Sequence, residues 1–200
     1  MLVLIKGAGD LATGAAVRLY RAGIPVVMTE VAQPTAVRRT VAFSQCMYDG
    51  AAQVEGISAR RAEDAGAARR ALERGEVPVL CDPAAAILGE LPFDGVVDAI
   101  LAKRNLGTAI TDAPVVLALG PGFTAGVDCH GVVETMRGHN LGRLLTQGSA
   151  APNTGVPGDV GGYTIQRIIR APADGAFEPL AAIGQRVEEG QPVARVAGRT

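Results

Sequence analysis

The sequence has little of what several protein classes require. It contains no tryptophan and only 4% aromatic residues, and its charges nearly cancel to a net −1. No basic stripe is present to meet a phosphate backbone, so nucleic acid is not an expected partner. No apolar run approaches the roughly 20 residues of a membrane span, and Lys6 interrupts the N-terminal run, so neither a membrane helix nor a signal peptide is expected.

Cysteine and histidine are also scarce. Cys46, Cys81 and Cys129 form no CxxC pair, which favours a reducing compartment, the cytoplasm, over a disulfide framework. The two histidines, His130 and His139, lack the spacing of a zinc motif. Adjacent residues on a strand point to opposite faces, so Cys129 and His130 are not expected to share a metal, and no metal site is predicted.

Short apolar runs separated by helical patterns are what the chain does contain. Five such runs cover residues 2–5, 25–29, 77–81, 96–101 and 115–119. Continuous rather than alternating hydrophobicity favours strands buried on both faces. The sequence therefore predicts an α/β fold with a Rossmann-like, mostly parallel sheet. Cys81 ends one of these runs and is expected to be a buried strand cysteine; the alternative is a reactive thiol beside Asp82-Pro83.

Two helices and a hairpin are expected between these strands. Helical spacing follows Leu11 as far as a C-cap at Gly23, and a second helix covers residues 62–74. Residues 41–48 and 53–59 are β-prone and flank Asp49-Gly50, a dipeptide typical of hairpin turns.

The first apolar run leads directly into a glycine turn, Gly7-Ala8-Gly9-Asp10-Leu11-Ala12, and Glu30 closes the next run. A dinucleotide fingerprint needs a tight turn at Gly7, a bare backbone at Gly9, a small residue such as Ala12 and an acid about twenty residues further on. The sequence therefore predicts a nucleotide-binding turn. The alternative is that the glycines only turn a strand into a helix.

Charged residues near this turn refine the expected ligand. Asp10 would act as a helix N-cap and repel a pyrophosphate, so either weak binding, a cation that shields Asp10, or a plain N-cap is expected. Glu30 would bond a ribose 2′-hydroxyl and favour NAD. Arg38 and Arg39 could instead neutralise the 2′-phosphate of NADP, or form a solvated basic pair.

Two later loops each follow an expected strand and would face the same crevice. Lys103 and Arg104 offer cations, and the loop with Gly120, Gly122 and Thr124 offers a nest of backbone amides or an ordered glycine turn. Two anion sites on one edge would suit a ligand with a long phosphate-bearing tail, such as a dinucleotide.

Glu134, Arg137 and His139 are the candidate catalytic residues. In a loop they could converge, with Arg137 orienting a phosphate or carboxylate and His139 titrating near neutrality. The alternative is an internal salt bridge that orders the loop.

The C-terminal pattern differs from the rest. Short strands joined by glycine turns predict a boundary between a Rossmann-like domain, residues 1–166, and a β-rich segment, residues 167–200, resembling half of a biotinyl/lipoyl barrel-sandwich. Its open edges would pair with the main domain, with another chain as in a homo-oligomer, or with residues that a truncation has removed.

Several segments together resemble the selenium-dependent molybdenum hydroxylase accessory proteins of the YqeB type, namely residues 5–14, 30–39, 97–105, 119–126, 134–139 and 153–155. The resemblance implies a Rossmann-like core, as in the xanthine dehydrogenase accessory proteins, and a role in maturing selenium-containing molybdenum hydroxylases. The expected function is an accessory factor that binds a nucleotide-bearing ligand and presents it to a hydroxylase apoenzyme. The alternative is an NAD(P)-dependent oxidoreductase or a cofactor-modifying transferase.

Overall fold

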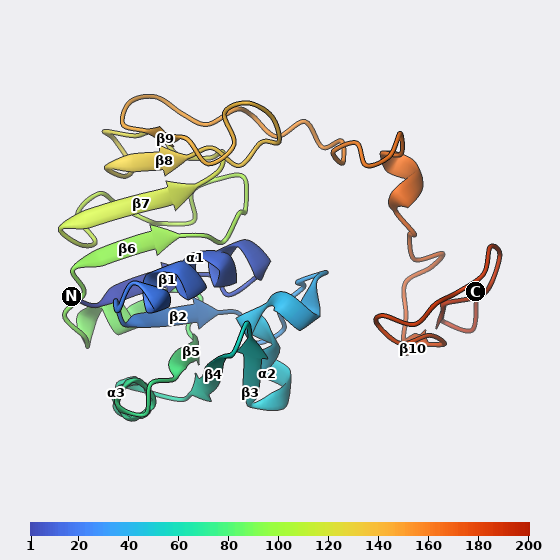
Figure 1. Cartoon of the computed structure of the whole chain (residues 1–200), viewed down its shortest axis with the longest axis horizontal. Coiled ribbons are helices and arrows are strands. Elements are labelled where there is room, and N and C mark those ends of the chain that lie inside the picture. Colours follow the sequence, from blue (N-terminus) through green and yellow to red (C-terminus); the bar gives the residue numbers. More distant parts are fainter. The chain divides into compact units, whose positions relative to one another are not determined.

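The chain divides into two compact units. The computed structural model describes residues 1–200, and the units are Met1–Asn153 and Thr154–Thr200 (Figure 1). The division falls earlier in the chain than the expected boundary between residues 166 and 167. No helix combines the length and apolar character needed to cross a membrane.

The first unit is built on a nine-stranded sheet with the order β3-β4-β5-β2-β1-β6-β7-β8-β9 (Figure 1). Its strands are β1 (Val3–Lys6), β2 (Val26–Glu30), β3 (Ala51–Val54), β4 (Ile57–Ala62), β5 (Val77–Cys81), β6 (Gly95–Asp98), β7 (Val115–Leu119), β8 (Gly131–Val133) and β9 (Leu144–Leu145). The end pairs β3–β4 and β8–β9 are antiparallel, and the pairs between them are parallel. The predicted α/β class with a mostly parallel, Rossmann-like sheet is confirmed.

Both faces of the central strands are buried, which explains their continuous apolar runs. Ile5 and Met28 pack into the cluster on the side of α1 (Asp10–Arg21), whereas Leu4 and Val27 pack into the cluster on the other face. That second face is covered by α3 (Ala65–Glu73) and the short helix η3 (Ala86–Gly89).

The two predicted helices are present, with shifted ends. In α1, Ala12 and Ala16 are fully buried against the sheet, so small side chains bring this helix close to β1. In α3, the Asp64 carboxylate caps the first turn by accepting the Ala67 amide at 2.6 Å. In α3 the buried residues are Ala65, Ala68 and Ala71, and Leu72 is half-buried.

The prediction of a strand over residues 41–48 is wrong. This segment forms the helical turns η1 (Arg39–Val41), η2 (Phe43–Gln45) and α2 (Cys46–Asp49). Phe43, Cys46 and Met47 are buried at helical spacing, and that burial overrides the local β propensity.

The predicted hairpin of residues 41–48 with residues 53–59 is therefore wrong as well, and a different hairpin forms. Gly50 has φ 76° and ends α2 in the left-handed conformation. The hairpin joins β3 to β4 through Glu55 and Gly56, with φ of 51° and 81°. Two consecutive residues with positive φ are typical of a type I′ turn.

The order of the strands creates a switch point beside β1. From β1 the chain builds β2 to β5 on one side, and it then crosses to β6 on the other side. In open α/β sheets, ligands bind outside the carboxyl ends of the strands at such a point. Strand β6 ends at Asp98, so residues 99–101, expected to be strand, belong to the loop at this edge.

The second unit contains the short helix η4 (Ile165–Arg167) and a small antiparallel sheet of β10 (Phe177–Pro179) and β11 (Ala194–Val196). The C-terminal segment thus supplies strands, as predicted, and they pair in register from Phe177 with Val196.

Candidate functional site

A cleft of about 360 Å³ lies at the switch point. Its first wall is the glycine turn with the start of α1, and its second is Glu30 with the loop that follows β2. The third wall is the beginning of the loop after β6, residues Ala99, Ile100 and Leu101. The cleft therefore occupies the place that the fingerprint predicted.

The two glycines of the turn are required for different reasons. Gly7 has φ +94°, and a Cβ there would lie 2.9 Å from the Ala99 carbonyl oxygen, so the fold itself demands glycine. Gly9 has φ −65°, and a Cβ there would meet no atom within 4 Å. The fold therefore leaves free space beside Gly9, which lines the cleft, and a phosphate group can approach the backbone there.

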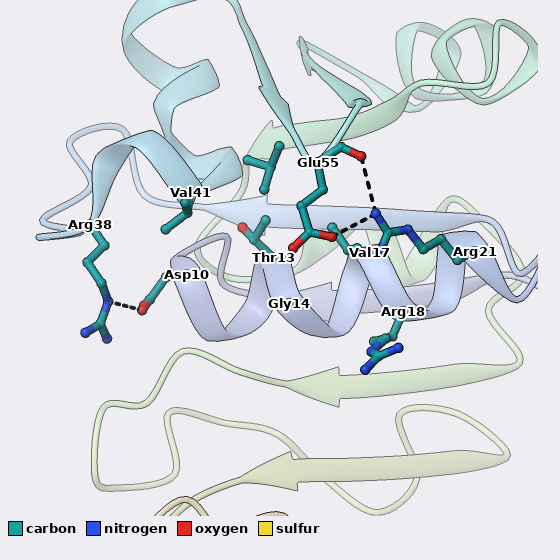
Figure 2. A pocket seen from close by; sticks show the side chains of 10 residues that line it. Asp10, Thr13, Gly14, Val17, Arg18, Arg21, Arg38, Val41 and Glu55 are labelled. Atoms are coloured by element: carbon teal, nitrogen blue, oxygen red, sulfur yellow. Dashed lines mark hydrogen bonds and ion pairs between the residues drawn. The ribbon is translucent and has the colours of Figure 1, made fainter. Parts of the chain in front are cut away.

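The first turn of α1 carries no side-chain cap, because its N-cap residue is Gly9. The prediction that Asp10 is the N-cap is wrong, since Asp10 is the first helical residue. Its carboxylate instead accepts a hydrogen bond from Nε of Arg38 (Figure 2). The cation beside Asp10 is therefore a side chain of the chain itself, and the amides of the first helical turn remain available to an anion.

Glu30 connects the end of β2 to the glycine turn. One carboxylate oxygen accepts the Ala8 amide at 2.9 Å, and the other accepts the Val31 amide at 2.8 Å. A carboxylate has about four lone-pair positions, so two remain for a ligand hydroxyl. Its place in the cleft wall suits the predicted contact with a ribose.

The two arginines after β2 point in different directions. Arg39 donates to the Gln45 side chain at 3.0 Å and stacks 5.5 Å from the Tyr48 ring centroid. Arg38 borders a second cleft, of about 420 Å³, which is also lined by Val17 of α1 and by Glu55 (Figure 2). Neither arginine lines the cleft at the glycine turn.

The loops after β6, β7 and β8 meet at the same edge of the sheet. A Cβ on Gly122 would lie 2.6 Å from backbone atoms of Arg104, and one on Gly120 would lie 2.7 Å from Oγ1 of Thr135. Lys103 and Arg104 are exposed on the first of these loops. The structure thus brings the two predicted anion-binding loops into backbone contact.

Thr124 differs from the expected anion donor in one respect. Its amide donates to the Asp128 carboxylate at 2.7 Å, and its hydroxyl lies 3.1 Å from the Ser149 hydroxyl. Both groups already have partners within the chain, so Thr124 does not offer a free donor to an anion.

Glu134, Arg137 and His139 line one small cleft of about 120 Å³. Glu134 is buried, and its carboxylate accepts the amides of Met136 at 2.7 Å and Ala151 at 2.8 Å. These bonds, that of Ala151 first, hold the pKa of Glu134 below its ordinary value. Glu134 is therefore ionised at neutral pH and orders the loop, with Arg137 and His139 beside it.

Three buried, hydrogen-bonded polar side chains on the face of the sheet opposite α1 were not predicted from the sequence. Lys6 Nζ donates to the Thr108 hydroxyl at 2.6 Å, and that hydroxyl donates to Asp98 at 2.6 Å. All three residues are buried, and Lys6 pairs in register with Asp98. A signal existed, because each charge is the last residue of an otherwise apolar strand.

The cysteines divide by exposure. The expectation that Cys81 is buried is wrong, because it ends β5 at the carboxyl edge with its side chain exposed. Cys46 is buried, and loss of solvation raises its pKa to about 12. No group of three or more His, Cys, Asp or Glu side chains could hold a metal ion.

Comparison with known proteins finds a relative whose name states no activity. No family model and no solved structure matches it. "Uncharacterized protein YqeB" of Escherichia coli (strain K12) is 54% identical over 193 residues, which are 96% of this chain and 36% of that protein. The chain thus spans about a third of the length of this curated relative. Over nearly all of its own length, the chain is a homologue of part of YqeB.

Proposed function

We propose that this chain binds a nucleotide-bearing ligand at the glycine turn and serves as a cytoplasmic accessory factor in the maturation of selenium-dependent molybdenum hydroxylases. The observation that carries the binding part is the free space above Gly9, in a cleft at the switch point of a Rossmann-like sheet.

Charge and hydrogen bonding support a nucleotide in this cleft. The uncapped start of α1 favours an anion, and Arg38 offsets the negative charge of Asp10. Glu30 retains acceptor positions for a ribose hydroxyl, which favours NAD or another ligand with a free 2′-hydroxyl over NADP. A molybdopterin-type dinucleotide would place its second half toward the exposed Lys103 and Arg104.

The accessory role rests on the resemblance to YqeB-type proteins and on the chemistry of the loops. The lowered pKa of Glu134 makes it a poor proton donor or acceptor at neutral pH. The alternative, an oxidoreductase or transferase, is supported by one observation: Arg137 and His139 share a cleft with Glu134. In that case they would contact the reacting part of the ligand.

A thermal-shift panel of NAD, NADP, AMP, CMP and molybdopterin nucleotides tests the ligand. We expect at least one nucleotide to raise Tm, by an amount that increases with the logarithm of its concentration once that exceeds Kd. Deletion of the gene tests the role: molybdenum hydroxylase activity should fall while its polypeptide is still made. Wild-type hydroxylase activity in the deletion strain would contradict the accessory role. Turnover of the bound nucleotide at saturation would favour the enzyme instead.

A further inference from the structure

We propose that Lys6, Asp98 and Thr108 form a positioning cluster that holds one wall of the nucleotide cleft in its binding geometry. This inference rests on the proposed function, because the wall matters only if a ligand binds there. Thr108 would not touch the ligand, and it would act through the loop to which it belongs.

The cluster joins three separate parts of the chain. Lys6 ends β1, Asp98 ends β6, and Thr108 lies in the loop that follows β6. The Thr108 hydroxyl accepts from Lys6 and donates to Asp98, each at 2.6 Å. A single hydroxyl therefore serves as the shared partner of a buried ammonium and a buried carboxylate.

The same loop is braced near Thr108 by a second side chain. Asn105 accepts the amides of Gly107 at 2.9 Å and Thr108 at 2.8 Å, and it donates to the Thr108 carbonyl at 2.8 Å. The backbone around Thr108 is thus held in one conformation, and the buried hydroxyl ties that conformation to the sheet.

The loop begins with the residues that form the cleft wall. Ala99 donates its amide to the Lys6 carbonyl at 2.8 Å, and Ile100 donates its amide to Asp98 at 3.2 Å. The Ala99 carbonyl and Ile100 Cα lie so close to Gly7 that a Cβ there would clash with both. A shift of the wall toward the turn is therefore blocked by Gly7, so the positions of the wall and of the glycine turn are coupled.

Backbone strain indicates that the wall needs such an anchor. Leu101 and Lys103 have φ of 60° and 64°, in the left-handed region that costs free energy for residues other than glycine. Strain of this kind persists only where surrounding contacts enforce it, and it is common at ligand sites. Buried charges are also costly unless satisfied, so loss of the shared hydroxyl should loosen both ends of the loop.

Thr108→Val tests the cluster, because it keeps the side-chain shape and removes the hydroxyl. For the best-bound nucleotide of the panel, we expect Kd to rise about tenfold, since two charge-assisted hydrogen bonds are lost. The Ala99 and Ile100 amides, which donate to the Lys6 carbonyl and to Asp98, should exchange hydrogen faster than in the wild type. Thr108→Ser restores the hydroxyl and should return both quantities to within about twofold of wild type.

Asp112→Ala is the matched control, because it removes a 3.1 Å bond to the Ala109 amide in the same loop and leaves the cluster intact. It should change neither the affinity nor the exchange of Ile100. If Thr108→Val does not fold, Asn105→Ala loosens the backbone at Thr108 while keeping the buried hydroxyl, and it must weaken binding in the same direction.

Unchanged affinity and unchanged exchange in a folded Thr108→Val protein would overturn the positioning cluster. A wild-type protein that binds no nucleotide would overturn the proposed function instead. In that case the hydrogen exchange of the Ala99 and Ile100 amides still decides whether Thr108 controls the wall.

Discussion

The carboxylate of Glu30 accepts the amide of Ala8 at 2.9 Å, across 22 residues of sequence. The acidic residue at the end of β2 and the glycine turn after β1 are therefore one hydrogen-bonded unit. In this arrangement Glu30 shapes the turn and also lies in the cleft wall.

Replacing Glu30 with glutamine should change the choice between NAD and NADP. A 2′-phosphate beside Glu30 is repelled by its charge, and glutamine removes that repulsion. The single oxygen of glutamine keeps only one of the two bonds from the Ala8 and Val31 amides, a loss that both nucleotides share, so the ratio of their affinities isolates the charge. We expect the ratio of NADP affinity to NAD affinity to rise by about tenfold, equal to about 1.4 kcal/mol. Isothermal titration of both nucleotides measures it, and an unchanged ratio would mean that the ribose lies elsewhere.

Arg38 should matter for anion binding more than for stability. Its ion pair with Asp10 is partly exposed, with 66% of the Arg38 side chain and 28% of the Asp10 side chain accessible, so its effect on unfolding should stay below about 1 kcal/mol. Arg38→Ala leaves the Asp10 charge at the helix start without its partner, and nucleotide affinity should fall about threefold.

The double variant supplies the control for Arg38. Asp10→Asn combined with Arg38→Ala removes both charges and should restore affinity close to wild type. If Asp10→Asn alone and Arg38→Ala alone both leave affinity unchanged, the pair has no part in ligand binding.

The three cysteines should differ in reactivity. Cys81 is exposed, whereas burial raises the pKa of both Cys46 and Cys129. Because the thiolate is the reactive form, iodoacetamide at pH 8 should modify Cys81 alone in the folded protein. Mass spectrometry of the digested protein identifies the site. Rapid modification of Cys46 under these conditions would contradict its burial beneath the helical turns.

Glu134 should make the fold sensitive to acid. Its pKa in the folded protein is held below its ordinary value of 4.5, so its stabilising effect is fully present above pH 4.5 and is lost as the pH falls through the lower, folded value. Glu134→Gln should lower the free energy of unfolding at pH 7 by about 1–2 kcal/mol. The difference between wild type and variant should shrink below pH 4.5.

Urea unfolding at a series of pH values measures this effect. Glu63→Gln is the matched control, because Glu63 is an exposed carboxylate paired with Arg61 at the surface. If the difference in unfolding free energy between wild type and Glu134→Gln does not vary with pH, the hydrogen bonds from the Met136 and Ala151 amides do not depend on the negative charge of Glu134.

Local pattern was sufficient for the central sheet and for the glycine turn. The runs that became β5 and β7 matched at both ends, because neither carries a competing signal. Val77 to Leu80 of β5 are buried on two faces, whereas β7 buries Val116 and Ala118 on one face. The roles of Gly7 and Gly9 also followed from local requirements, namely a positive φ and an open side.

Local pattern failed where distant contacts decide the conformation. Phe43 and Cys46 could form either a strand or a helix, and their burial in the core cluster on the α1 face of the sheet selects the helical turns. The same applies to Asp10: the sequence suggested an N-cap, but its partner Arg38 lies 28 residues away. Thr108 could not be identified at all, because only the register of Lys6 with Asp98 shows what it joins.

Calorimetric titration of the tightest-binding nucleotide into Gly9→Ala tests the central claim most directly. The added methyl group meets no protein atom and suits the φ of −65°, so the fold should be unaffected, while the approach of a phosphate to the backbone is blocked. Gly14→Ala is the matched control, because it adds a methyl group to α1 at a position where no atom lies within 4 Å. Gly14 lines the second cleft and not the cleft at the glycine turn. We predict that Gly9→Ala raises Kd at least about tenfold and that Gly14→Ala leaves it unchanged. Wild-type affinity in a folded Gly9→Ala protein would contradict nucleotide binding at this turn.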